Sequence, residues 1–165
     1  MRTLVRAVVL AMAAVSLAGC GGSNGSSASE EVERQADFWA ITELQRKFHQ
    51  ATSKKDIDLM MSLYAPNATL TIPGQTAVGR EQIRRFWVTK SDAFKRTNQW
   101  ISETPAYKMR VTADGDRGTL HFECHYLDLN GKTVKVFLTA DQEVARIEGK
   151  WLITDMVVGT AEPTP

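Results

Sequence analysis

The stretch from Lys54 to Gly74, KKDIDLMMSLYAPNATLTIPG, decides the fold. Asp56 is suited to cap a helix, because its carboxylate can accept a hydrogen bond from a free amide of the first turn. Apolar residues then recur at helical spacing and give the helix one apolar face that ends with Tyr64. Pro66 cannot continue a helix, so we expect this helix to end at Ala65.

The second half of the stretch has the pattern of a strand. Ala68, Leu70 and Ile72 alternate with polar residues until Pro73 and Gly74 interrupt the run. Alternation with a period of two is typical of a strand with one buried face. The stretch therefore predicts a helix, a turn and a strand in succession.

Two further helices flank this stretch. The first is expected to begin between Glu30 and Phe38 and to run to about Thr52. Its apolar stripe consists of Phe38, Ile41, Leu44, Phe48 and Ala51. The other helix follows Gly79, with Ile83, Phe86 and Trp87 as its buried positions.

The second half of the chain has the pattern of an antiparallel sheet. Alternating residues around Val111, a strand from Thr119 to Leu127 and a strand from Lys132 to Ala145 are separated by turn residues. Asn130-Gly131 predicts a two-residue hairpin loop of type I′. The whole pattern predicts an α+β fold, with three N-terminal helices packed on a curved antiparallel sheet.

Two of these segments resemble a known superfamily. Helices that end in Tyr/Phe-Ala-x-Asp/Asn-Ala before a strand, here Tyr64 to Ala68, are typical of the NTF2-like or SnoaL-like proteins, which include the ketosteroid isomerases. A helix start of the form found at Gly79 to Phe86 is typical of them as well. The resemblance covers residues 36–160 and implies a cone-shaped domain with an interior cavity. It does not imply one activity, because this fold carries many unrelated functions.

The first residues have the pattern of an export signal. Arg2 and Arg6 precede an apolar run that is too short for a good transmembrane helix and ends in Leu17-Ala18-Gly19-Cys20. This ending resembles the lipobox of bacterial lipoproteins, which implies cleavage before Cys20 and a lipid on its sulfur. The alternative is an ordinary secretory signal with a Cys at this position by chance.

The lipobox sets the expected domain organisation. We expect a signal peptide at 1–19, the lipidated Cys and a flexible Gly/Ser-rich tether at 20–35, the domain at 36–160 and a tail at 161–165. The resemblance implies an anchor in the cell envelope, facing the periplasm or the exterior. Gly21 after the Cys implies the outer membrane if the cell is Gram-negative.

The composition excludes some partners. The chain has 20 basic and 19 acidic residues, so no charge excess favours a nucleic acid. If Cys20 carries lipid, Cys124 has no disulfide partner, and we expect it to be a small buried hydrophobic residue. We expect no cofactor.

His121, Glu123 and His125 are the candidate catalytic residues. With a two-residue loop, they lie on one face of the hairpin, opposite aliphatic residues of the next strand. One hypothesis is a pocket that uses a His/Glu acid–base pair. Another is a partly solvated or dimer-forming outer face. A shared metal ion is disfavoured, because residues four apart on a strand are about 13 Å apart.

The resemblance also identifies candidate ligand-binding residues: Tyr64, Phe48, Ile72 and Trp87. In ketosteroid isomerases, an Asp base stands where this chain has Ile72, and an oxyanion-hole Tyr stands where it has Phe48. Without these groups the chain is not expected to be that enzyme.

Three functions are therefore expected. The first is a lipoprotein that binds a small apolar or amphipathic ligand in its cavity. The second is a SnoaL-like isomerase, dehydratase or hydrolase. The third is a module that forms a homodimer within an envelope complex.

Overall fold

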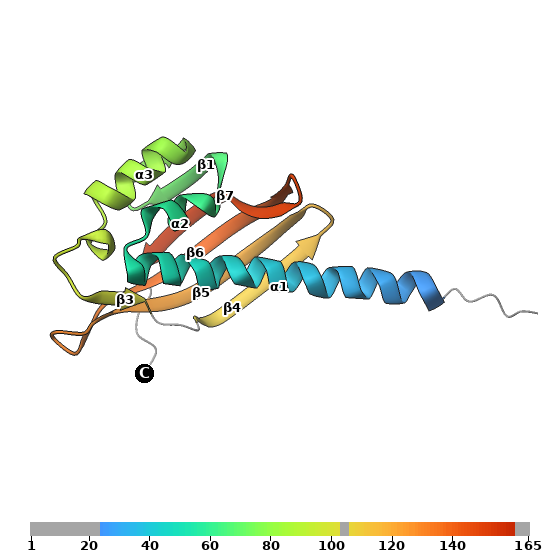
Figure 1. Cartoon of the computed structure of the whole chain (residues 1–165), viewed down its shortest axis with the longest axis horizontal. Coiled ribbons are helices and arrows are strands. Elements are labelled where there is room, and N and C mark those ends of the chain that lie inside the picture. Colours follow the sequence, from blue (N-terminus) through green and yellow to red (C-terminus); the bar gives the residue numbers. More distant parts are fainter. Residues whose placement is uncertain (1–23, 103–105, 161–165) are drawn as a thin grey trace, which may run out of the picture.

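The computed structural model describes residues 24–102 and 106–160 (Figure 1). In this part of the chain the elements are, in order, α1 (Asn24–Lys54), α2 (Ile57–Ser62), β1 (Tyr64–Ile72), β2 (Gln75–Val78), α3 (Gly79–Thr89), the 3-10 helix η1 (Asp92–Phe94), β3 (Trp100–Ser102), β4 (Tyr107–Asp114), β5 (Arg117–Asp128), β6 (Thr133–Ile147) and β7 (Lys150–Thr160). None of the described helices combines the length and hydrophobicity needed to cross a membrane. The fold class is α+β, as predicted.

The strands form one mixed sheet in the order β2-β1-β7-β6-β5-β3, and β4 also pairs with β5. Its neighbours are antiparallel except β1 and β7, which run parallel. The expectation of a purely antiparallel sheet was therefore wrong. The three helices are not all N-terminal to the sheet, because α3 follows β1 and β2; a strand before the third helix was predicted from the sequence. The alternation within a strand specifies which side chains are buried, but not the direction of the neighbouring strand.

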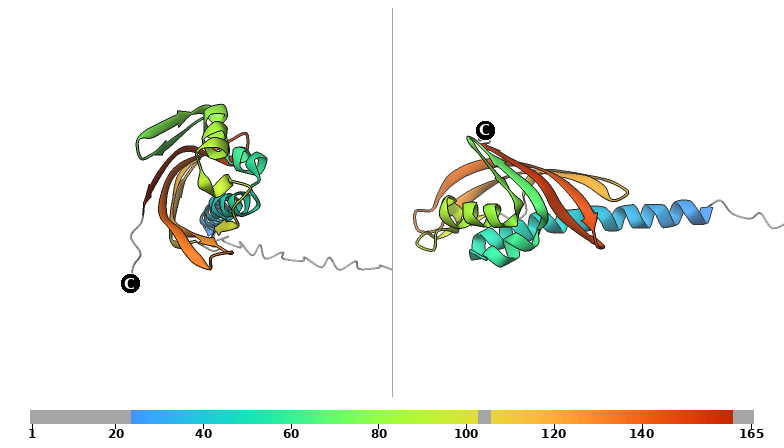
Figure 2. Two further views of the ribbon diagram at one scale, coloured as in Figure 1. Left: turned by 90° about the vertical axis from the view of Figure 1, so that its left-hand side faces the viewer. Right: turned by 90° about the horizontal axis from the view of Figure 1, so that it is seen from above.

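The helices cover one face of the curved sheet (Figure 2). We call this the inner face; in β5 it carries Leu120, Phe122, Cys124 and Tyr126, all of them buried. The opposite, outer face carries the residues between them. Gly118 allows α1 to approach, because a Cβ there would lie 3.0 Å from Ile41 Cδ1 and 2.5 Å from the Thr112 carbonyl oxygen. The close contact between helix and sheet thus depends on a residue without a side chain.

Helix α1 is longer than predicted. It begins at Asn24, so Asn24 to Gln35 are helical rather than part of a flexible tether. Side chains within the helix stabilise this part: Glu31 accepts hydrogen bonds from Arg34 and Gln35, three and four residues further on. Packing against the sheet starts near Asp37, which accepts hydrogen bonds from Arg146 at 2.7 Å and from Trp151 Nε1 at 3.1 Å.

The central stretch folds largely as its pattern predicts. Asp56 caps α2 by accepting a hydrogen bond from the Leu59 amide at 2.9 Å, and Ala68 and Leu70 are buried on β1. However, α2 ends at Ser62, and Tyr64 is the first residue of β1 rather than the end of the helix. The reason is the sheet: the Ile153 amide donates to the Leu63 carbonyl at 2.8 Å, so β7 binds the chain before Pro66 is reached.

The hairpin between β5 and β6 differs from the predicted geometry. Four residues separate the two strands, and Lys132, not Gly131, adopts a positive φ of 51°. A shift in register between Tyr126 and Leu127 then moves the pairing by one residue. His121 therefore lies opposite Asp141, Glu123 opposite Thr139 and His125 opposite Phe137. The predicted aliphatic partners were wrong, because a bulge is not visible in the alternation of a single strand.

Candidate functional site

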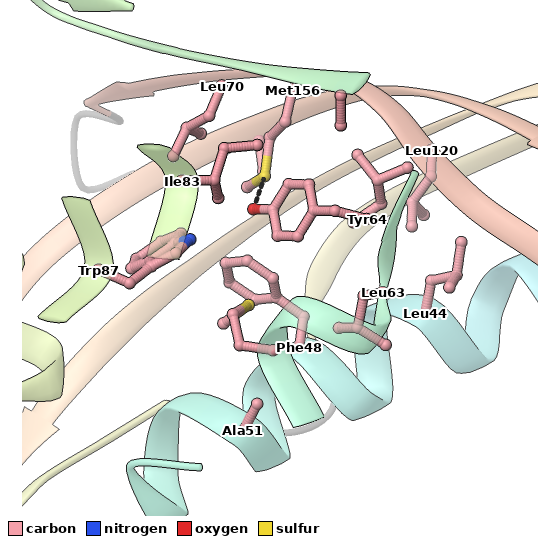
Figure 3. Close-up of a cluster of buried hydrophobic side chains, with 14 of the residues drawn as sticks. Leu44, Phe48, Ala51, Leu63, Tyr64, Leu70, Ile83, Trp87, Leu120 and Met156 are labelled. Atoms are coloured by element: carbon pink, nitrogen blue, oxygen red, sulfur yellow. Dashed lines mark hydrogen bonds between the residues drawn. The ribbon is translucent and has the colours of Figure 1, made fainter. Parts of the chain in front are cut away.

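Aromatic side chains from both layers pack together in the domain interior. The Phe48 ring on α1 lies 5.7 Å from Trp87 on α3 and 5.8 Å from Phe122 on β5, measured between ring centroids. All three side chains are buried, and Figure 3 shows Phe48 and Trp87. The structure therefore brings together two of the predicted ligand-binding residues, Phe48 and Trp87, which belong to different helices.

Tyr64 joins this group from β1. Its hydroxyl donates a hydrogen bond to Met156 Sδ at 3.1 Å (Figure 3). Burial raises the pKa of the Tyr64 hydroxyl well above its usual range, and the nearby indole N–H of Trp87 lowers it by a smaller amount. Tyr64 is therefore a neutral hydrogen-bond donor at any physiological pH.

Gln142 places a side-chain amide beside Met156, the residue that Tyr64 contacts. It lies on β6 directly opposite Met156 on β7, and its Nε2 donates to Met156 Sδ at 3.6 Å. Its other amide atom, Oε1, is buried and has no hydrogen-bond partner among the described residues. The same holds for Trp87 Nε1, which approaches the Tyr64 oxygen without completing a hydrogen bond.

His49 is an interior residue that the sequence analysis missed. Its side chain is fully buried, lies within hydrogen-bonding distance of the Gln45 amide at 3.2 Å and packs edge-on against the Phe122 ring at 5.3 Å. The spacing Ile41, Gln45, His49 continues the apolar stripe of α1 in steps of four residues. That spacing was the available signal.

The other predicted ligand-binding residue is Ile72. Ile72 is half-buried at the end of β1 and packs against the edge of the core. Cys20 lies outside the described residues. Cys124 is buried on the inner face of β5, as predicted.

His121, Glu123 and His125 lie on the outer face of β5, because the residues that alternate with them face the helices. His121 Nδ1 lies 2.6 Å from Asp141 Oδ1, and Glu123 forms an ion pair with Lys108 at 2.9 Å. The His125 ring packs near Tyr107 and Phe137, with centroid distances of 5.9 and 5.5 Å. The three residues thus belong to one polar and aromatic surface, and their catalytic role stays a prediction.

No cluster of three His, Cys, Asp or Glu side chains in residues 24–102 and 106–160 could hold a metal ion. A surface cleft of about 440 Å³ lies elsewhere, between α1, α2 and the turn from β6 to β7. Trp39, which is 68 % exposed, borders this cleft together with Leu63 and Trp151. The interior group and this cleft are separate features of the molecule.

The model of the SnoaL-like domain family matches residues 45–152, which is most of the described domain. The chain belongs to this family. No curated protein matches it. The SnoaL-like match begins at Gln45, so the N-terminal half of α1 lies outside it.

Solved structures with the same fold extend the likeness to the whole SnoaL-like domain. An NTF2-like protein with a cystatin-like fold from Novosphingobium aromaticivorans is 15 % identical, with a TM-score of 0.70 over 88 % of this chain and 94 % of that one. An NTF2-like protein from Pseudomonas putida KT2440 is 18 % identical, with a TM-score of 0.68 over 78 % and 89 %.

A third structure is an enzyme: the hexachlorocyclohexane dehydrochlorinase LinA-type3 from Novosphingobium barchaimii LL02. It is 18 % identical, with a TM-score of 0.66 over 82 % of this chain and 93 % of that one. At such identities these likenesses establish the NTF2-like fold and nothing about the reaction.

Proposed function

We propose that this protein is a lipid-anchored SnoaL-like protein whose interior binds a small, mainly apolar molecule. The observation that carries the proposal is the Gln142 amide, which is buried in an otherwise apolar interior and whose Oε1 has no hydrogen-bond partner among the described residues; the hydrogen-bonded pair Gln45 and His49 is buried there as well. Burying a polar group is costly unless it is hydrogen-bonded, so Gln142 Oε1 calls for a partner, which a ligand would provide.

The surroundings of these polar groups support the proposal. Ligand sites in proteins are mostly apolar, with a few polar groups that fix the orientation of the ligand. Here Phe48, Trp87 and Phe122 supply the apolar walls, and Tyr64 supplies a neutral donor. The dehydrochlorinase of the same fold is named for hexachlorocyclohexane, which is itself a small apolar molecule.

Methionine methyl groups provide the test. Met156 is fully buried beside Tyr64, whereas Met109 on β4 is 39 % exposed and serves as an internal control. In NMR spectra of protein labelled with ¹³C at the methionine methyls, small aromatic probes should shift the Met156 signal and leave that of Met109 in place. Equal shifts at both methyls, or none at Met156, would contradict binding in the interior.

The proposed anchor is a lipid on Cys20, which would hold the domain at the cell envelope facing the periplasm or the exterior. Support comes from the sequence Leu17-Ala18-Gly19-Cys20 after an apolar run. In cells fed a palmitate analogue, the wild-type chain should be labelled, and Cys20→Ala should be neither labelled nor cleaved. Equal labelling of this variant would exclude lipidation at Cys20.

The buried His49 favours a second candidate, an isomerase, dehydratase or hydrolase. An imidazole beside an apolar ligand can exchange a proton with it, and Gln45 would hold the ring in place. If this is correct, His49→Phe should abolish turnover of a substrate found by screening while the Met156 signal still responds to it. Unchanged turnover would exclude His49 as the acid–base group; His121→Phe tests the outer face in the same assay.

A further inference from the structure

Two buried side chains, Trp87 and Gln142, each carry a polar atom without a hydrogen-bond partner among the described residues, and both lie close to residues that meet at the Met156 sulfur. Gln142 Nε2 and the Tyr64 hydroxyl both donate to Met156 Sδ, and the Trp87 indole lies beside the Tyr64 hydroxyl. Figure 3 shows the indole nitrogen of Trp87 on the side of the ring that is turned toward Tyr64. Trp87 and Gln142 are 5 % and 3 % exposed, so both side chains are shielded from bulk solvent.

The local partners leave both side chains incompletely bonded. Trp87 Nε1 is a donor without an acceptor, and Gln142 Oε1 is an acceptor without a donor, among the residues that the structure describes. The sulfur that binds Tyr64 and Gln142 is only a weak acceptor. Buried groups of this kind are normally paired, so each of them calls for a partner of the complementary type.

The surroundings exclude a charged partner. The buried polar residues of the described chain are Gln45, His49, Thr52, Ser102 and Gln142, and none of them is Asp, Glu, Lys or Arg. Phe48, whose ring centroid lies 5.7 Å from that of Trp87, and Ile83, four residues before Trp87 on α3, are both apolar and buried (Figure 3). A charged group placed there would have no counter-ion and would lose its hydration.

We infer that the ligand of the interior is an uncharged molecule with a hydroxyl group, which accepts a hydrogen bond from Trp87 Nε1 and donates one to Gln142 Oε1. A hydroxyl is the smallest group that combines an acceptor with a donor. The rest of the molecule is apolar and packs against Phe48 and Trp87. This inference rests on the proposed function, because it specifies the chemical class of the ligand that the interior binds.

Four probes with a common benzyl unit separate the contributions of the hydroxyl donor, the hydroxyl acceptor and charge to binding. Benzyl alcohol carries the hydroxyl, and ethylbenzene replaces that hydroxyl with a methyl group of similar size. Benzyl methyl ether can only accept a hydrogen bond, and phenylacetate is charged. We expect benzyl alcohol to bind at least ten times more tightly than ethylbenzene, the ether to lie between them and phenylacetate not to shift the Met156 methyl signal.

Two variants test whether Trp87 and Gln142 cause the preference for the alcohol. Trp87→Phe removes the N–H but keeps an aromatic ring, and Gln142→Met removes the amide but keeps the length of the side chain. Each should bring the affinity for benzyl alcohol to within about threefold of that for ethylbenzene, whose own affinity stays nearly constant. Trp39→Phe, at an exposed position on α1, is the matched control and should preserve the tenfold preference. Gln142→Met decides alone if Trp87→Phe does not fold.

The outcomes separate this inference from the proposed function. If ethylbenzene and benzyl alcohol shift the Met156 signal with equal affinity, the interior binds apolar molecules and the hydroxyl inference is wrong. If both variants keep the preference for the alcohol, the two atoms named above do not recognise it, and the inference is wrong as well. If none of the four probes shifts the Met156 signal, both the inference and the proposed function are wrong.

Discussion

At the scale of single residues, Phe48 is the side chain that contacts the other aromatic rings of the interior. Its ring contacts Trp87, His49 and Phe122, which belong to α3, α1 and β5. A side chain that is 1 % exposed and contacts three aromatic rings contributes both buried area and shape to the core. Phe48 should therefore be among the positions where truncation is most harmful.

We predict that Phe48→Ala lowers the free energy of unfolding by about 3–5 kcal/mol, because it removes a packed ring and leaves a cavity. Urea denaturation followed by far-UV circular dichroism measures the loss. Trp39→Ala on the exposed side of the same helix should cost less than about 0.5 kcal/mol. Similar losses for both variants would show that the inner side of α1 has been misassigned.

For Gln142 we predict that a substitution increases stability instead of reducing it. Replacing a buried, incompletely bonded amide with an apolar side chain of similar shape removes a desolvation cost. We therefore expect Gln142→Met to raise the free energy of unfolding by about 1 kcal/mol in the absence of ligand. The same denaturation experiment measures it, and a loss of more than about 1 kcal/mol would indicate that the amide is satisfied in the folded protein.

At the scale of elements, the patterns with a local cause were predictable. A carboxylate at Asp56 caps a helix wherever it occurs, and alternation at Ala68 and Leu70 buries one side of any strand. The parallel pairing of β1 with β7 depends on residues far apart in the chain, so neither strand carries a signal for it. The bulge near Leu127 also leaves no mark on the alternation of either strand, and it shifts the pairing of His121 by one residue.

The interior site was predictable in part for the same reason. Phe48 and Trp87 lie on helical stripes, so their burial follows from spacing, whereas Tyr64 begins β1 instead of ending the predicted helix. Gln142 alternates with Ala140 and Val144, which places it on the inner face, but only the structure shows that Met156 lies opposite. A polar residue within an apolar pattern is therefore the most useful sequence signal for this kind of site.

The pairing of β6 with β7 leads to a prediction about pH. Asp155 lies directly opposite Glu143, and burial together with this negative charge raises the pKa of Asp155. The folded state therefore holds the Asp155 proton more tightly than the unfolded state. The resulting stability is present below the unfolded pKa of about 3.9 and is lost as the pH rises through the folded pKa.

Asp155→Asn removes the charge of Asp155 and with it the repulsion from Glu143. At pH 7 the variant should be more stable than the wild type by about 0.2–1 kcal/mol, the usual size of an unfavourable cross-strand pair. The difference should shrink as the pH falls toward 4, as measured by thermal unfolding across that range. Glu148→Gln in an exposed turn controls for the loss of a charge, and a pH-independent difference for Asp155→Asn would contradict the explanation.

At the scale of the whole molecule, the fold has two layers with different roles. The inner face and the helices enclose the candidate site, while the outer face carries the half-buried His121, Glu123 and His125. A homodimer through the outer face stays a prediction. The N-terminal part of α1 belongs to neither layer, since the side chains of Ser27 to Ala36 are exposed (Figure 1).

We predict that deleting residues 24–35 changes the free energy of unfolding by less than about 0.5 kcal/mol, because exposed side chains contribute little to the core. Asp37→Ala should cost more, since it removes the hydrogen bonds from Arg146 and Trp151 that hold α1 to the sheet. Denaturation of both variants measures the difference. A deletion that destabilises more than Asp37→Ala would mean that this part of α1 packs against the domain.

The free part of α1 would set a distance to the membrane. If Cys20 carries the proposed lipid, only three residues link it to Asn24, so the linker between bilayer and helix is short. The helix from Asn24 to Ala36 would then act as a stiff spacer of about 20 Å, at roughly 1.5 Å per residue. Glu30, Glu31 and Glu33 would be repelled by anionic lipid headgroups, which favours an upright spacer. The domain would then meet its ligand at a fixed height above the bilayer rather than on its surface.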